Sequence, residues 1–368
     1  MKQSLNTLAS ILFFFLCTAC TGADVTRPDD KDGEEEGIPL HVRNLGMWVE
    51  METRSVVTGG PADEASNPNP LATVGVCVTK RTADGAESLY DGNVKNQQFM
   101  YNAMGVPPAW ELAEGMEPLC LYTEKATVYG YAPAEKSVSL TGTPRTLLMS
   151  GVRVLDKQKF YFNDGGQPVD VVTDIQWETD QDDYLYCTAS EQADRWHPEV
   201  SLLMQHALAK VSFRILEEGS AFDGCLVEKV VLKSNGGLEK ANSARLNLST
   251  GSLEGTLLMV DQLVFTAGGD MREIGTGTDD TGKVPIQAFG LVIPVTGIGV
   301  TLELTLDDGR AFTMKPTDAS GDPGTFTANW KKGYNYIYNI RLQAQGIELT
   351  DIQVAGWNDG GEYDIPVE

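Results

Sequence analysis

The sequence predicts an all-β protein of two domains, and three observations lead to that expectation. Apolar residues alternate with polar ones in many short segments, which is the period of a strand with one buried face. Gly, Pro, Asn and Asp separate these segments, and the chain carries 38 Gly and 17 Pro, which β-turns prefer. The length of 368 residues suits two domains of about 150 to 200 residues. Short strands between frequent turns favour a sandwich or a barrel over alternating strands and helices.

The first segment is an export signal over residues 1–19. Lys2 gives it a positive start, and residues 8–16 are an apolar stretch that is shorter than the about 20 residues of a membrane-spanning helix. Small residues stand directly before Cys20, as in a bacterial lipobox. We therefore expect Cys20 to carry a lipid such as palmitate. An ordinary cleaved signal peptide is the alternative.

Residues 20–37 follow as an acidic tether. The segment is rich in Asp and Glu and lacks aromatic residues, so repulsion between like charges keeps it extended. The whole chain has 28 Lys and Arg against 52 Asp and Glu, which gives a net charge of -24. A surface this negative repels phosphate backbones, which argues against nucleic acid as a partner.

Residues 38–195 are the expected first sandwich domain. Residues 73–78 place three Val on one face of a strand, and residues 126–132 are a second strand-like segment. Residues 183–186 form a further strand after an acidic turn, shortly before the expected domain boundary. The segment therefore contains enough strands for a β-sandwich of its own.

Residues 196–368 are the expected second sandwich domain. Residues 200–209 fit either an amphipathic helix or a strand. The strand is favoured because the same alternation continues through Val211, Phe213 and Ile215.

The second domain also contains a clear hairpin. Residues 300–306 alternate cleanly and then meet Asp308 and Gly309, a strong turn signal, before the chain returns as a second strand. Residues 334–342 form another alternating face, rich in Tyr. Both segments agree with a sandwich of antiparallel strands.

No catalytic or metal-binding motif stands out. Residues 277–283 match the G-x-x-x-x-G-K spacing of a phosphate-binding loop, but Val284 stands where that loop needs Ser or Thr, and Pro285 disfavours the helix that must follow. The 3 His have no metal-ligand spacing, and His206 is expected to be a buried, hydrogen-bonded core residue. We therefore expect no enzyme activity, metal or cofactor. Four cysteines lie beyond the lipobox, far apart in sequence: Cys77, Cys120, Cys187 and Cys225. An exported protein could pair them in three ways, whereas domains of this size can also build a core without disulfides, so the sequence leaves both states open.

Four pieces of the sequence form a pattern along nearly the whole chain. They are Cys20 with its lipobox, residues 45–53 followed by Arg54, residues 183–186 followed by 205–211, and residues 334–340 followed by 347–357. The third piece is the most specific. In this order the pieces resemble the fimbrillin family, the lipoprotein precursors of type V pili in Bacteroidota-type bacteria. The resemblance implies two transthyretin-like β-sandwich domains in tandem, in agreement with the alternation of apolar residues.

The resemblance also implies a mode of assembly. In this family an arginine-specific protease removes an N-terminal strand from the outer-membrane lipoprotein, and a strand of the next subunit fills the groove. The removable strand would be about residues 46–53, beginning as early as residue 38, with cleavage after Arg54 or, as the alternative, after Arg43. The implied partners are other fimbrial subunits, the protease and the outer membrane. The implied final location is a cell-surface fimbrium.

The donor strand implied by the resemblance is residues 347–366. Its apolar positions fall in two phases, so a bulge or break is expected near residue 351. The last of them either anchors the inserted strand or caps the core of the second domain. These positions are Ile347, Leu349, Ile352, Val354 and Trp357.

Stalk, tip and anchor subunits share this pattern, so the sequence does not separate these three roles. The alternative from another class is a surface glycan-binding lipoprotein, which would also be exported, acidic and all-β. Such a protein needs exposed aromatic side chains as binding platforms. The candidates are Trp110, Trp177, Trp196 and Trp330.

Overall fold

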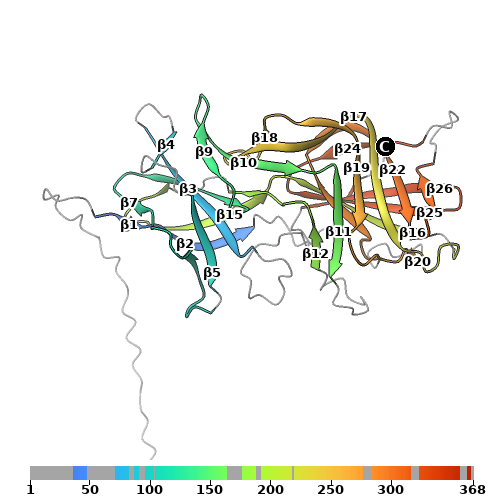
Figure 1. Ribbon diagram of the computed structural model, residues 1–368, viewed down its shortest axis with the longest axis horizontal. Helices are drawn as coiled ribbons and strands as arrows, with labels where there is room; N and C mark the ends of the chain where they lie inside the picture. The colour runs from blue at the N-terminus through green and yellow to red at the C-terminus, as the bar shows by residue number, and fades with distance from the viewer. Residues whose placement is uncertain are drawn as a thin grey trace, which may run out of the picture. The chain divides into compact units, whose positions relative to one another are not determined.

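The computed structural model is all-β, as the sequence predicts, and every regular element among its described residues is a strand (Figure 1). The chain divides into two compact units, residues 1–36 and 37–368, and nearly all of the first lies outside the described residues. The structure describes residues 36–47, 71–82, 87–90, 96–102, 104–163, 176–187, 192–217, 219–276, 284–315, 323–356 and 363–365.

The first sheet has nine strands in the described part of the chain. Its order is β2-β15-β13-β8-β3-β5-β6, with β14 beside β8 and β4 beside β3. The strands are β2 (His41–Met47), β15 (Glu199–His206), β13 (Leu185–Tyr186), β8 (Ala126–Ala132), β3 (Thr73–Arg81), β5 (Gln97–Asn102), β6 (Ala109–Leu112), β14 (Gln192–Ala193) and β4 (Glu87–Leu89). A separate antiparallel pair is formed by β1 (Ile38–Pro39), which precedes β2, and β7 (Cys120–Leu121), which precedes β8.

A second sheet of ten described strands follows the order β12-β11-β19-β17-β10-β9. Four further strands lie outside this order: β18 and β22 pair with β17, and β23 and β24 pair with β22. The strands are β12 (Gln176–Thr179), β11 (Lys157–Asn163), β19 (Leu258–Ala267), β17 (Val227–Asn247), β10 (Thr146–Val154), β9 (Val138–Thr141), β18 (Leu253–Glu254), β22 (Val295–Leu306), β23 (Ala311–Thr313) and β24 (Phe326–Trp330).

The third sheet has six described strands in the order β20-β16-β25-β26-β27, with β21 beside β16. At its centre β16 runs parallel to β25, while β26 is antiparallel to β25. The strands are β20 (Gly275–Thr276), β16 (Ala209–Glu217), β25 (Tyr334–Gln343), β26 (Gly346–Gly356), β27 (Tyr363–Ile365) and β21 (Ala288–Val292).

Alternation along the strands explains the two main cores. In the N-terminal core, Val74, Val76 and Val78 of β3 are at most 5% exposed, as the pattern of residues 73–78 predicts. In the C-terminal core, side chains of the second and third sheets pack together, and the ring centroid of Phe213 in β16 lies 5.9 Å from that of Phe265 in β19. Period-2 patterning is therefore enough to place these side chains inside.

The ambiguous segment after residue 199 is a strand, and the helix alternative is wrong. Val200, Leu202 and Met204 of β15 are buried and alternate with more exposed neighbours. The chain turns at Ala207 and Leu208 and enters β16 at once. A helix would spread these apolar residues over more than one face, whereas the strand gathers them on the N-terminal core.

The predicted hairpin between β22 and β23 is confirmed. Thr305 faces Ala311 and Glu303 faces Thr313 across the turn. Gly309 has φ +85°, a conformation that residues with a Cβ adopt at a steric cost. The turn residue and the strand pattern therefore agree at this position.

The sheets do not divide at residue 196, where the sequence suggested a domain boundary. Figure 1 shows β15, which follows that residue, among the strands of the first sheet. Conversely β9 to β12, which precede it, lie in the second sheet. A middle core explains the exchange, because Tyr131 of β8 and Met149 of β10 pack in one cluster with Leu246 of β17. The transthyretin-like type of each sandwich stays a prediction.

Candidate functional site

The first candidate element is the edge strand β2, which overlaps the start of the predicted removable segment. It pairs with a single neighbour in its sheet, β15, and this is the one parallel pair among the described strands of that sheet. Two further backbone bonds fix its beginning, Leu40 N to Leu119 O at 2.9 Å and His41 N to Pro198 O at 2.8 Å. An edge strand with one ladder is the element of a sheet that is replaced most easily.

Three apolar side chains hold β2 and its preceding residue to the N-terminal core. Leu40 and Val42 are each 3% exposed, and Leu45 is 8% exposed. Burying a side chain of this size contributes about 1.5–3 kcal/mol. On its other flank β2 contacts β6, the opposite edge of the same sheet. Loss of β2 would therefore uncover a groove between β15 and β6 with an apolar floor.

The two arginines proposed for cleavage differ in what the structure describes. Arg43 lies within β2, and its guanidinium is 3.8 Å from Glu199 of β15, with side chains 69% and 59% exposed. Such an exposed pair contributes at most about 1 kcal/mol. Arg54 lies outside the described residues, as do Cys20, most of residues 46–53 and the tether. Lipidation and cleavage at these positions stay predictions.

The second candidate element is β26, which contains four of the five predicted donor residues. It pairs with β25 along its whole length and with β27 on its other side. Ile347 is 1% exposed, and Leu349, Ile352 and Val354 pack against the C-terminal core. Trp357 lies outside the described residues.

The predicted bulge near residue 351 is present in β26. The register with β25 shifts between Asn339 and Ile340, because Asn339 faces Asp351 while Ile340 faces Leu349. Thr350 is the extra residue, and its hydroxyl donates to Asn339 O at 3.0 Å. This extra residue explains why the apolar positions fall in two phases.

A buried arginine of β16 forms hydrogen bonds to β25 and β26, the next two strands of the third sheet. Arg214 of β16 is 5% exposed. Its Nη1 donates to Asn339 Oδ1 of β25 at 3.2 Å and to Gln353 Oε1 of β26 at 3.0 Å, and its Nε donates to Val284 O at 2.9 Å. Removing β26 would take one acceptor from a buried charge, which is costly. Sequence analysis missed this contact, because a polar residue at an alternate position of a strand suggests an exposed face.

A second buried polar cluster explains why residues 183–186 and 205–211, the two segments of the third resembling piece, belong together. β13 pairs with β15, so Leu185 faces His206, and His206 Nδ1 lies 2.8 Å from Asp183 Oδ2. The buried, hydrogen-bonded state predicted for His206 is confirmed. Lys210 is 0% exposed; burial lowers its pKa to about 7, an effect that the charge of Asp183 partly offsets. Sequence analysis did not identify Lys210.

The cysteines and tryptophans give two clear outcomes. All four described cysteines are free thiols, and burial raises the pKa of Cys77 to about 12. Trp110 is 7% and Trp330 is 1% exposed, so these two are core residues and are excluded as candidate binding platforms. Trp196 is 40% exposed, and the side chain of Trp177 is not among those described.

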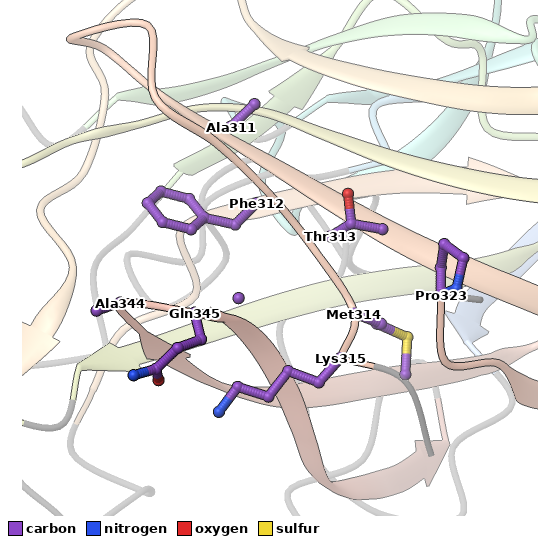
Figure 2. A pocket seen from close by; sticks show the side chains of 9 residues that line it. Ala311, Phe312, Thr313, Met314, Lys315, Pro323, Ala344 and Gln345 are labelled. Carbon is purple, nitrogen blue, oxygen red and sulfur yellow. The ribbon is translucent and has the colours of Figure 1, made fainter. Parts of the chain in front are cut away.

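A surface pocket of about 370 Å³ lies where β23 meets the turn between β25 and β26 (Figure 2). Met314 and Ile347 form a parallel bridge beside it, and Lys315 N donates to Ile347 O at 2.9 Å. The pocket is lined by Ala311, Phe312, Thr313, Met314, Lys315, Pro323, Ala344, Gln345 and Gly346.

Among the described residues, no group of His, Cys, Asp and Glu is arranged to hold a metal ion, and no helix is long and apolar enough to cross a bilayer.

Comparison with known proteins identifies the fold and the sequence family. The chain matches the model of the fimbrillin-like family over residues 68–357. No match was found among curated proteins. A candidate cell adhesion protein from Bacteroides ovatus is 16% identical, with a TM-score of 0.52 over 88% of this chain and 98% of that one. This likeness shows the β-sandwich fold.

Two other solved structures are similar at lower scores. A candidate cell adhesion protein from Bacteroides uniformis is 17% identical, with a TM-score of 0.45 over 87% of this chain and 98% of that chain. The tip fimbrial protein Mfa3 from Porphyromonas gingivalis, with a C-terminal truncation, is 9% identical, with a TM-score of 0.36 over 79% of this chain and 95% of that chain.

The buried Lys210 predicts a pH-dependent stability. Its folded pKa of about 7 lies below its ordinary value of 10.5. Below pH 7 the lysine is charged in the folded and the unfolded chain, and the cost of burying the charge is fully present. Between these two pKa values only the unfolded chain binds the proton, so the free energy of unfolding rises with pH, by at most about 1.4 kcal/mol per unit.

Urea unfolding of parent and Lys210→Met between about pH 6.5 and 9.5 measures this rise. The rise should be present in the parent and strongly reduced in Lys210→Met. Lys233→Met, which removes a lysine with a side chain 45% exposed, serves as the control and should keep it. An unchanged rise in Lys210→Met would show that another group causes it.

Proposed function

Because the chain belongs to the fimbrillin-like family, we propose that it is a structural subunit of a cell-surface fimbrium, a type V pilus, with a role in adhesion. The family match over residues 68–357 carries the proposal. The described strands support a structural role, since their polar clusters are buried and hydrogen-bonded. The chain would act by assembly and binding rather than by catalysis.

The proposed route to the surface begins with a lipoprotein. The lipobox at Cys20 and the acidic tether that follows it support export to the outer membrane as a lipid-anchored precursor. A single acyl chain gives only weak membrane binding, so stable anchoring needs more than one. The other fimbrial subunits, an arginine-specific protease and the outer membrane are the proposed partners.

The proposed assembly step is donor-strand exchange at β2. Cleavage after Arg54 would leave β2 joined to the body by hydrogen bonds and side-chain burial alone. The single ladder to β15 supports this step, since one neighbour is all that must be given up. A new strand from another subunit would restore the lost backbone bonds, each worth about 0.5–1.5 kcal/mol net.

The proposed donor is the segment that begins with β26. Its apolar positions suit a groove with an apolar floor, and it directly follows the turn after β25 near the end of the given sequence. In the isolated chain it completes its own sandwich, with Gln353 on the buried Arg214. To be donated, β26 must therefore give up its contacts with its own sheet and replace them with contacts in the groove of the acceptor subunit.

A surface glycan-binding lipoprotein is the second candidate. The exposed Trp196 favours it, because a partly exposed aromatic ring can stack on a sugar. Trp110 and Trp330 lie in the cores, so two of the four candidate tryptophans cannot serve as sugar-binding platforms. Glycan arrays with Trp196→Ala as the comparison variant would separate the two.

Lipidation at Cys20 is tested by metabolic labelling with a radioactive fatty acid. The parent chain should incorporate the label, and Cys20→Ala should not, because the thiol that accepts the lipid is gone. Cys120→Ala, which removes a half-buried cysteine of the folded body, is the control. Equal labelling of Cys20→Ala and the parent would reject the lipid anchor at this position.

Cleavage at Arg54 is tested by digesting the purified precursor with an arginine-specific protease and imaging the products by electron microscopy. The parent should form filaments, and Arg54→Ala should stay a monomer because β2 remains covalently attached. Arg43→Ala should behave as the parent, since that side chain lies within a strand ladder. Filaments from Arg54→Ala but not from Arg43→Ala would move the cleavage to Arg43.

The donor role of β26 is tested by locking that strand to its own chain. Arg341 and Glu348 face each other across β25 and β26, and paired strand positions are about 4.5–5.5 Å apart at Cα, within the range of a disulfide. The oxidised Arg341→Cys and Glu348→Cys chain should accept a strand but donate none, and reduction should restore donation.

Filament growth from labelled seeds measures the two activities separately. The reduced double variant is the matched control, because it has the same sequence and differs by one covalent bond. If the oxidised chain still donates, β26 is not the donor, and the segment after Gly356 becomes the candidate.

A further inference from the structure

An exposed apolar tip lies in the hairpin between β5 and β6. Met104 is 92% exposed and Val106 is 100% exposed, and Pro107 and Pro108 that follow are exposed as well. We name these four residues the apolar tip. Single exposed apolar residues are common, but a group of neighbouring ones on a loop marks a contact surface.

Hydrogen bonds hold the apolar tip in one shape. Asn102 Oδ1 accepts a bond from Met104 N at 3.1 Å, and Asn102 O accepts one from Gly105 N at 3.3 Å. The amide of Asn102 also donates to Glu111 Oε2 on the returning strand at 3.0 Å. A tip that is already ordered loses little conformational entropy on binding. These contacts therefore favour a preformed binding element over a flexible loop.

The pocket beside β23 has the size and chemistry to receive this tip. Its volume of about 370 Å³ exceeds the about 150 Å³ that holds a benzene molecule, so two aliphatic side chains fit. Phe312 and Met314 supply apolar surface, and Figure 2 shows the Lys315 and Gln345 side chains along one side of the pocket.

The charges at the two surfaces have opposite signs. Glu111 is exposed at the base of the apolar tip, whereas Lys315 lines the pocket and donates to a neutral acceptor, the side-chain oxygen of Gln343. In a chain of net charge -24, two copies repel each other over most of their surfaces. A contact that places Lys315 of one copy near Glu111 of the other brings opposite charges together and avoids this repulsion.

We propose that the apolar tip of one copy inserts into the β23 pocket of a second copy. The two surfaces are different, so the contact is head-to-tail and can repeat without closing, as a filament requires. The inference rests on the proposed self-assembly. It does not need strand exchange, because the pocket is complete while β26 stays in its own sheet, where Gly346 lines the pocket and Lys315 N donates to Ile347 O. It adds a second contact between neighbouring subunits.

The test places a photo-crosslinking amino acid at position 106 and maps the crosslinked peptides by mass spectrometry. It is run on protease-treated parent chain and on concentrated, unassembled Arg54→Ala chain. Crosslinks between chains should fall on residues 311–315 or 344–346 in the Arg54→Ala sample, in which β26 keeps its place beside the pocket. Ala344→Asp, which puts a charge at an exposed position of the pocket, should lower their yield about tenfold, as about 1.4 kcal/mol of lost binding gives.

A crosslinker at Met259, which is 66% exposed in β19, is the matched control and should give no pocket crosslinks. Crosslinks from position 106 to other surfaces, or none between chains, would overturn the proposed contact. Filaments without pocket crosslinks would reject the pocket contact and leave the strand-exchange proposal intact. Pocket crosslinks in Arg54→Ala without any filaments from the parent would support the pocket contact and reject assembly by strand exchange.

Discussion

The parallel ladder between β16 and β25 is the constraint on which the C-terminal sandwich depends. Residues 210–217 pair with residues 335–342, so the chain must leave β16, build β17 to β24 and return before the ladder forms. Parallel neighbours always need such a crossover, and here it is most of an entire sheet. β16 is buried along its whole length and lies beside β25 at the centre of the third sheet. The central pair of this sheet therefore joins two segments of the chain that are separated by most of the second sheet.

The same ladder explains why polar residues lie inside. Lys210, Ser212 and Arg214 alternate with the apolar residues of β16 and are all buried. Ser212 donates to Asn335 of β25 at 2.8 Å, and Arg214 reaches both β25 and β26. Apolar side chains can slide past one another at little cost, but these bonds are satisfied in one register. The polar residues thus specify which strand lies beside which, while the apolar residues supply most of the stabilising burial.

The sequence predicted the strands well and their neighbours poorly. Alternation places the faces of β3, β15, β22 and β25, because a period of two is a local property of each strand. Which strand pairs with which depends on contacts between distant residues, and this is why no local pattern places β9 to β12 in the same sheet as β17. The buried Arg214 and the core positions of Trp110 and Trp330 were missed for a related reason. Burial of a polar or amphipathic side chain depends on partners that no local pattern reveals.

The four described cysteines are free thiols. The described strands therefore pair without any covalent bond between thiols, and folding of this part of the chain needs no oxidising catalyst. Cys77 is buried and donates to Asn96 at 2.8 Å, and with a pKa raised to about 12 it holds almost no thiolate, the form that oxidants attack. The proposed filament of such subunits would need no oxidising step to hold its strands together, because burial and hydrogen bonding do not depend on electron supply.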